Sequence, residues 1–138
     1  MENRSTMAGG CQCGQVRYEV TAAPLNVYIC HCRECRKQSG SALGISVIVR
    51  AAELRLVQGE LKRWSRPTDS GHILDCFFCA ECGSRVWHGD RDREETISIK
   101  GGSLDEPPDL SSATHIWTVR KLPGVIIPDS AQRYDQEP

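Results

Sequence analysis

The stretch "CFFCAECG", residues 76–83, decides how this chain is held together. Within it, Cys79 and Cys82 have the C-x-x-C spacing and are followed by glycine, which is typical of a tight knuckle whose backbone amides point at thiolate sulfurs. Such a knuckle normally supplies half of a tetrahedral zinc site made of four thiolates. The other half needs two cysteines on another piece of backbone, and "CQCG" near the N-terminus supplies Cys11 and Cys13. Zinc held by these four residues would join the start of the fold to its middle and contribute its binding free energy to folding.

A second group of cysteines lies in "CHCREC", residues 30–35. Three thiolates, those of Cys30, Cys32 and Cys35, can hold one zinc ion, because the x-x spacing places the last two on one face of a short helix. The fourth position then belongs to water or to a substrate atom, which is the pattern of catalytic zinc. In the alternative interpretation, Cys76 is the fourth ligand and the site is a second structural zinc.

Length, composition and charge restrict the class of protein. A chain of 138 residues, 39% hydrophobic and 25% charged, predicts one domain. Its formal charge of -1 lacks the basic excess of a nucleic-acid-binding protein. No apolar run approaches the ~20 residues that span a bilayer, and the N-terminus lacks the apolar middle of a secretion signal. We therefore expect a soluble, cytoplasmic protein with neither nucleic acid nor membrane as a partner, in which eight cysteines indicate metal or redox chemistry.

Hydrophobic periodicity predicts a mainly β fold. In "QVRYEV", residues 15–20, apolar and aromatic residues alternate with polar ones, as in a half-buried strand. Similar short, β-branched or aromatic segments, separated by Gly, Pro, Asp and Ser, are 45–49, 54–61, 72–78, 84–89, 96–104 and 115–119. One short helix is expected over residues 33–40, which are rich in helix formers and close with glycine. The sequence thus predicts antiparallel sheets and one short helix.

An ordered series of motifs carries a resemblance to a known family. The motifs are "GGCQCGQVRYEV", "CHCRECRKQSGS", "GELKRW", "FCAECGSRVW", "GSLD", "HIWT" and "KLPG". Over residues 9–124 the chain resembles the glutathione-dependent formaldehyde-activating enzymes, a family that also includes centromere protein V. The resemblance implies a zinc-stapled β-tent domain over this range with two zinc ions, one structural and one catalytic. Residues 1–8 and 125–138 are expected to be flexible termini.

The same resemblance assigns the ligands and the reaction. By position, the structural zinc site is Cys11, Cys13, Cys79 and Cys82, and the catalytic site is Cys30, Cys32 and Cys35, with Cys76 outside the family's ligand pattern. The family's namesake reaction joins glutathione to formaldehyde, giving S-hydroxymethylglutathione, and its members are grouped as carbon–sulfur lyases. We therefore expect a zinc-dependent carbon–sulfur lyase acting on a glutathione-derived or other small-molecule thiol. The alternative is a non-enzymatic zinc-binding interaction module or a glutathione carrier.

Three cations flank the catalytic cysteines. Two carboxylates on a glutathione-like substrate could be bound by Arg33, Arg36 and Lys37, although these side chains fit a solvated helix face equally well. Three thiolates around zinc leave a formal charge of about -1, which weakens Lewis acidity and favours sulfur exchange over hydrolysis. His31, between two ligand cysteines in an extended segment, is expected to point away from the metal. His115 fits either a packed position or the edge of a pocket.

Overall fold

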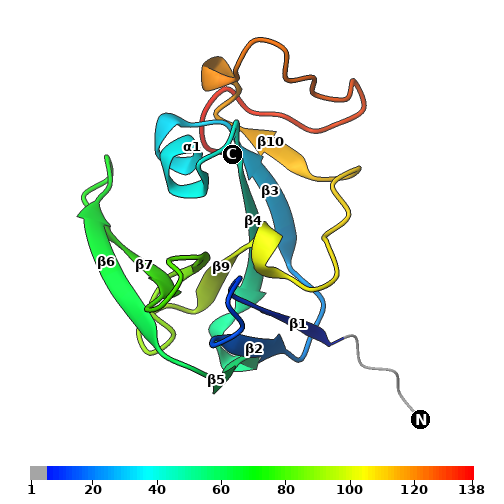
Figure 1. The fold of residues 1–138 in the computed structure, drawn as a ribbon. Helices are drawn as coiled ribbons and strands as arrows, with labels where there is room; N and C mark the ends of the chain where they lie inside the picture. Colours follow the sequence, from blue (N-terminus) through cyan, green and yellow to red (C-terminus); the bar gives the residue numbers. More distant parts are fainter. Residues whose placement is uncertain (1–5) are drawn as a thin grey trace.

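Two β-sheets form the framework of the protein in a computed structural model that describes residues 6–138 (Figure 1). The smaller sheet has the order β1-β2-β5, and its strands are β1 (Met7–Gly10), β2 (Arg17–Val20) and β5 (Leu54–Gln58). The larger sheet has the order β10-β3-β4-β9-β8-β7-β6. Its strands are β3 (Asn26–Cys30), β4 (Gly44–Arg50), β6 (Leu61–Pro67), β7 (Ile73–Cys79), β8 (Arg85–His88), β9 (Thr96–Lys100) and β10 (Thr114–Ile116).

Antiparallel pairing dominates both sheets, and the prediction of a mainly β fold is confirmed. The exception is β10, which pairs parallel with β3. The predicted helix is also present: α1 (Arg33–Ser39) follows β3 and ends at Gly40, whose backbone is left-handed. Three short 3₁₀ turns are η1 (Ala51–Glu53), η2 (Gly101–Ser103) and η3 (Thr118–Arg120). Across residues 6–138, no helix combines the length and apolar character needed to cross a membrane.

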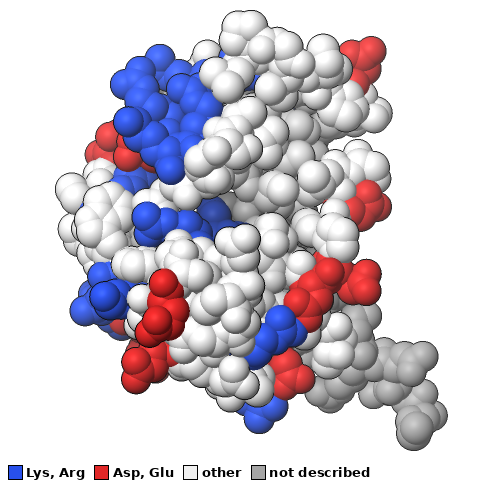
Figure 2. Space-filling model, viewed as in Figure 1, with Lys and Arg blue, Asp and Glu red and all other residues white. Residues whose placement is uncertain are grey.

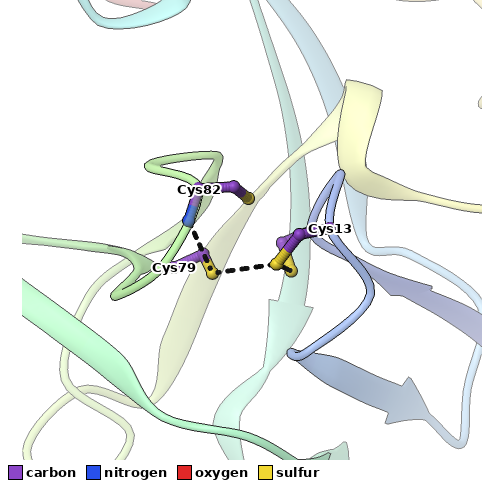
Figure 3. A group of neighbouring side chains, drawn as sticks. Cys13, Cys79 and Cys82 are labelled. Carbon is purple, nitrogen blue, oxygen red and sulfur yellow. Dashed lines mark hydrogen bonds between the residues drawn. The ribbon is translucent and has the colours of Figure 1, made fainter.

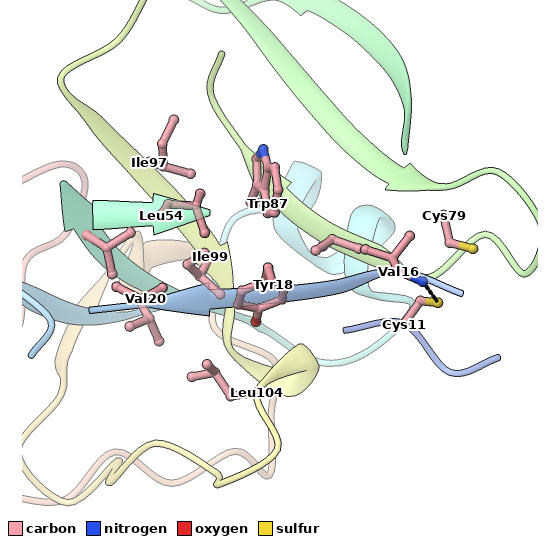
Figure 4. Packing of buried hydrophobic residues seen from close by; sticks show 13 residues of the cluster. Cys11, Val16, Tyr18, Val20, Leu54, Cys79, Trp87, Ile97, Ile99 and Leu104 are labelled. Atoms are coloured by element: carbon pink, nitrogen blue, oxygen red, sulfur yellow. Dashed lines mark hydrogen bonds between the residues drawn. The ribbon is translucent and has the colours of Figure 1, made fainter. Parts of the chain in front are cut away.

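The hydrophobic core lies where β2 and β5 pack against the larger sheet (Figure 4). Tyr18 of β2 meets Trp87 of β8 edge to face, with ring centroids 5.7 Å apart. The alternation predicted for residues 15–20 is confirmed, because Val16, Tyr18 and Val20 are all buried. The tyrosine hydroxyl hydrogen-bonds to Ser103 Oγ at 2.6 Å, so its polar end is satisfied inside the core.

Alternation along β9 gives the larger sheet a second, polar face. Ile97 and Ile99 belong to the core, whereas Ser98 and Lys100 point to the opposite side. Strand β8 behaves in the same way, since Trp87 enters the core and the next residue, His88, faces away from it. The polar face lies beneath α1, and it forms the floor of the cavity described below.

Three strand predictions differ from the structure in their extent. Residues 96–104 form β9 only as far as Lys100, where η2 follows. Residues 54–61 form two strands in different sheets, because Gly59 adopts a φ of 95° between β5 and β6. The segment 115–119 contains only the end of β10, because Trp117 has a left-handed backbone with a φ of 55° and begins η3. A bulky residue at positive φ is costly, and single-residue propensity gives no sign of it.

The two termini were predicted to be flexible. Of residues 1–8, the first five lie outside the described residues, and Met7 and Ala8 belong to β1. The segment 125–138 returns beside β10 (Figure 1). The backbone N–H of His115 donates to the Gln132 carbonyl at 2.9 Å, and the N–H of Tyr134 donates to the His115 carbonyl at 2.9 Å.

Candidate metal centres and the adjoining cavity

The first cysteine group joins the two sheets. Its members come from the loop after β1 and from the end of β7 with the turn that follows, and their sulfurs all lie within 4.8 Å of one another: Cys11, Cys13, Cys79 and Cys82. Figure 3 shows three of these side chains converging from the two pieces of backbone. The Sγ atoms of Cys13 and Cys79 are 3.7 Å apart. Spacing predicted these four residues as one set, although nearly half of the chain separates Cys13 from Cys79.

Backbone amides surround the Cys79 sulfur as a zinc knuckle requires. It accepts hydrogen bonds from the N–H groups of Glu81 at 3.3 Å and Cys82 at 3.4 Å. The turn is possible because Gly83 adopts a φ of 79°, which side-chain-bearing residues rarely adopt. Ser84 hydrogen-bonds to the Cys82 sulfur and is the main reason that the pKa of Cys82 falls to about 5. The turn therefore stabilises thiolates, the form of cysteine that binds metal.

The second group, the three-thiol group, consists of Cys30, Cys32 and Cys35, whose sulfurs also lie within 4.8 Å of one another. Cys30 ends β3, and Cys32 is the N-cap of α1, where its sulfur accepts the backbone N–H of Cys35 at 3.3 Å. The neighbouring thiols of Cys30 and Cys35 hold the pKa of Cys32 far below its ordinary value, and the pKa of Cys30 is raised correspondingly. Helix α1 can approach β4 closely because Gly44 has no side chain. A Cβ atom at this position would lie only 3.0 Å from the Cβ atom of Cys35.

Cys76 belongs to neither group. It is fully buried in β7, opposite Trp64 of β6 and His88 of β8, and burial raises the pKa of its thiol. Among residues 6–138 no other His, Cys, Asp or Glu side chain joins the three sulfurs within the same distance. The three-thiol group therefore contains three protein sulfurs, and the geometry does not support Cys76 as a fourth ligand.

A cavity of about 350 Å³ adjoins the three-thiol group. All three of its cysteines line this space, whereas the four-cysteine group does not. The floor is the polar face of the larger sheet, and one wall comes from β6 and β7. The lining residues besides the cysteines are Glu34, Gln38, Ser46, Ile48, Arg66, Thr68, His72, Leu74, Asp75, His88, Gly89, Glu94, Thr96, Ser98, Lys100, Ile116, Trp117 and Glu137.

The cations predicted as substrate contacts lie around this cavity and not in its lining. Arg33 is exposed and borders a neighbouring depression together with Cys32. Arg36 donates a hydrogen bond from its guanidinium to the Arg120 carbonyl at 2.7 Å. Lys37 is exposed on the other side of α1.

The cations that do line the cavity are Arg66 and Lys100, which sequence reasoning missed. The available signal was the alternation of Ser98 and Lys100 with buried isoleucines in "TISIK".

The histidines occupy three different settings. His31 is fully buried and points away from the sulfurs of its neighbours, with its Nε2 2.9 Å from Nδ1 of His115. His115 is itself buried on β10, so this pair connects the ligand loop to the last strand. His72 is exposed and lies 3.3 Å from a carboxylate oxygen of Glu94. His88, which has no distinguishing sequence context, lines the cavity floor.

Both cysteine groups have the chemistry of zinc sites. Thiolate sulfur is a preferred ligand of zinc, and four sulfurs within 4.8 Å suit the tetrahedral geometry of a closed structural site. Three sulfurs at the edge of a cavity suit a site with one position left for another atom. Each group could hold one metal ion, which agrees with the predicted number of two.

A mainly β framework with two cysteine-only groups, one of them facing a cavity, defines a cysteine-rich metal-binding class of protein. A family model described as "Glutathione-dependent formaldehyde-activating enzyme" matches residues 6–120. The chain therefore belongs to this family, as its motifs suggested. It is also similar to the crystal structure of a Rhodobacter sphaeroides protein, with a TM-score of 0.60 and 28% sequence identity over 79% of this chain and 99% of that chain.

Proposed function

We propose that the protein is a zinc-dependent carbon–sulfur lyase of the formaldehyde-activating type, acting on glutathione or another thiol adduct such as S-hydroxymethylglutathione. The observation that carries this proposal is the difference between the two cysteine groups. All three members of the three-thiol group line one cavity of about 350 Å³, whereas Cys11 alone of the other group lines a separate cavity, of about 360 Å³. A small molecule in the first cavity can approach a metal ion that has only three protein ligands. Family membership supports the same reaction class.

The residues divide into two roles under this proposal. Cys11, Cys13, Cys79 and Cys82 would hold the zinc that stabilises the fold. The three-thiol group would hold the second zinc, which supplies a Lewis-acidic position for the sulfur of the substrate. During cleavage the carbon–sulfur bond of the hemithioacetal breaks, its hydroxyl proton is lost as the carbonyl forms, and sulfur leaves as a thiolate.

Apolar side chains in the cavity walls favour cleavage of the carbon–sulfur bond. Ile48, Leu74 and Ile116 give the cavity apolar surface and restrict water next to the three-thiol group. Arg33, at the neighbouring depression, remains a candidate for contact with the outer part of a glutathione-like substrate, with Arg36 and Lys37 further along α1.

The proposal is tested by measuring exchange between formaldehyde and S-hydroxymethylglutathione at equilibrium with two-dimensional exchange NMR. Thiols and formaldehyde combine spontaneously, so the protein must raise the exchange rate above that of buffer alone. Cys32→Ser should return the rate to background, whereas Lys62→Gln, which changes an exposed residue of β6, should retain most of it. An unchanged exchange rate with the zinc-loaded protein would contradict a lyase.

Two outcomes of the same experiment correspond to the alternatives. Tight glutathione binding without faster exchange would identify a glutathione carrier. No binding and no exchange would indicate a zinc-stapled interaction module. We also propose a cytoplasmic location, which is supported by eight cysteines that are all free thiols, as a reducing compartment maintains them.

A further inference from the structure

The cavity floor is polar because strand register brings residues from distant parts of the chain together. His88 of β8 pairs with Ser98 of β9, and Lys100 of β9 pairs with Ser46 of β4. The Lys100 ammonium lies 3.4 Å from Ser46 Oγ. Arg66 enters from β6, at the side of the same cavity. The floor thus presents two cations, an imidazole and two hydroxyls toward the three-thiol group.

Several of these groups lack a hydrogen-bond partner within residues 6–138. The atoms are Nε2 of His88, Oγ of Ser98 and Nε of Arg66, and each is buried; Oε1 of Gln38, which also lines the cavity, is a fourth. The His88 residue as a whole is 8% exposed. A buried polar atom without a partner is destabilising, and native proteins normally satisfy such atoms. Four of them around one cavity indicate a polar ligand that completes their hydrogen bonding, and all except the Gln38 oxygen can donate a hydrogen bond to an anion.

The unpaired charge at the floor is positive. Neither Lys100 nor Arg66, nor the nearby Arg85, forms an ion pair with a carboxylate in the described part of the chain. Burial and then the charges of these three cations lower the pKa of His88 to about 3, so its imidazole is neutral at neutral pH. Figure 2 shows Lys and Arg side chains gathered in the region of α1 and in the hollow beneath it.

Four carboxylates line the cavity, and in the described part of the chain none of them lies within ion-pair distance of Lys100 or Arg66. Asp75 accepts a hydrogen bond from Ser65 Oγ at 2.5 Å, and Glu137 accepts one from the Trp117 indole at 3.0 Å. Glu94 lies against His72 at the rim, and Glu34 is exposed in the first turn of α1. Each of these carboxylates is therefore either engaged by another residue or open to solvent.

We propose that Lys100 and Arg66, together with His88 and Ser98, form an anion-binding subsite that receives a carboxylate of the thiol substrate. This inference rests on the proposed function in that the sulfur end of the substrate is taken to lie at the three-thiol group. The subsite makes the protein selective for carboxylate-bearing thiols over neutral thiols of similar size. It also places recognition of the acid at the sheet face and not on the exposed cations of α1.

The test compares two ligands and three variants at neutral pH. The ligands are 3-mercaptopropionate and its neutral amide, and the variants are Lys100→Gln, Arg66→Gln and the control Lys62→Gln, which changes an exposed residue of β6. Dissociation constants for the zinc-loaded protein are measured by isothermal titration calorimetry. A charge-assisted hydrogen bond contributes enough that the wild type should bind the acid about tenfold or more tightly than the amide. Lys100→Gln and Arg66→Gln should each remove most of that preference, while their affinity for the amide stays unchanged and Lys62→Gln keeps the wild-type preference.

A third ligand separates this inference from the proposed function. Propionate has no sulfur, so its binding reports the subsite whether or not the three-thiol group holds a metal or catalyses any reaction. It should shift the NMR signals of the His88 imidazole in the wild type and do so much less in Lys100→Gln. Equal affinity of the wild type for acid and amide would overturn the subsite. An equal loss of affinity for the acid and for the amide in Lys100→Gln would also overturn it. Tighter competition by inorganic phosphate than by propionate would overturn the assignment to a carboxylate.

Discussion

Replacing Cys79 by serine is expected to destabilise the whole domain. The Cys79 side chain is buried, and its sulfur accepts three hydrogen bonds, from the N–H groups of Glu81 and Cys82 and from Nε2 of Gln15. Serine has a shorter bond to its oxygen and cannot reproduce this geometry. At about 1 kcal/mol for each hydrogen bond, the loss is about 3 kcal/mol before any loss of metal binding. Domains of this kind have a total stability of about 5–15 kcal/mol, so the change is a large fraction of it.

The corresponding change in the three-thiol group is expected to spare the fold. Cys32 is the N-cap of α1, and its sulfur accepts the N–H of Cys35. Serine is among the most favourable N-cap residues, so Cys32→Ser keeps the cap while removing a metal ligand. The helix it begins has no buried residue, which limits what its disturbance can cost.

Thermal unfolding followed by circular dichroism, with zinc measured per chain, checks both expectations. Cys79→Ser should lower the Tm by about 10 °C or more, because 1 kcal/mol corresponds to about 3–4 °C in a domain of this size. Cys32→Ser should lower it by less than half as much and retain one zinc. Cys76→Ala serves as the control, because it changes a buried cysteine outside both groups and should retain both metals. Equal destabilisation by Cys32→Ser and Cys79→Ser would refute the division into a structural and a catalytic site.

Three further outcomes are expected. A chelator should remove the zinc of the three-thiol group much faster than the other, and a thiol ligand should slow only that loss, because three protein ligands leave one coordination position open and four do not; two equally inert ions would count against an open site. Cys76 should resist alkylation until the protein unfolds, since it is fully buried, and mass spectrometry of the labelled chain measures this directly. The depressed pKa of His88 means that the unfolded chain binds a proton that the native protein does not, so stability should fall as pH drops from about 6.5 toward 3, by up to about 1.4 kcal/mol per pH unit. The pKa values of the buried His31 and His115 are also lowered, so urea unfolding of His88→Gln should show a smaller pH dependence than that of the wild type, and identical profiles would contradict the contribution of His88.

The features that could be predicted are those fixed by short-range chemistry. The knuckle at Cys79 and Cys82 follows from their spacing and from Gly83, and the short helix from its composition and from Gly40. The sets of four and three cysteines followed from ligand number alone, because zinc prefers four ligands and the knuckle supplied only two of them. The family assignment rests on the same motifs.

What only the tertiary structure decided is which residues face the cavity. Cys76 directly follows Asp75 and lies three residues before Cys79. Its position in β7 nevertheless excludes it from both cysteine groups, and no rule based on sequence spacing predicts that exclusion. The exposed cations of α1 looked like substrate contacts because they are adjacent in sequence to the ligands, yet Arg66 and Lys100 line the space next to the sulfurs.

The physical reason is strand register. Pairing of His88 with Ser98 and of Ser46 with Lys100 depends on hydrogen-bonded ladders between strands far apart in the chain, and a slip of one residue would turn every one of these side chains into the core. The sequence by itself therefore determined which residues can hold the metals and where the local turns and the helix lie. The three-dimensional arrangement of β4, β8 and β9 determined what those metals face.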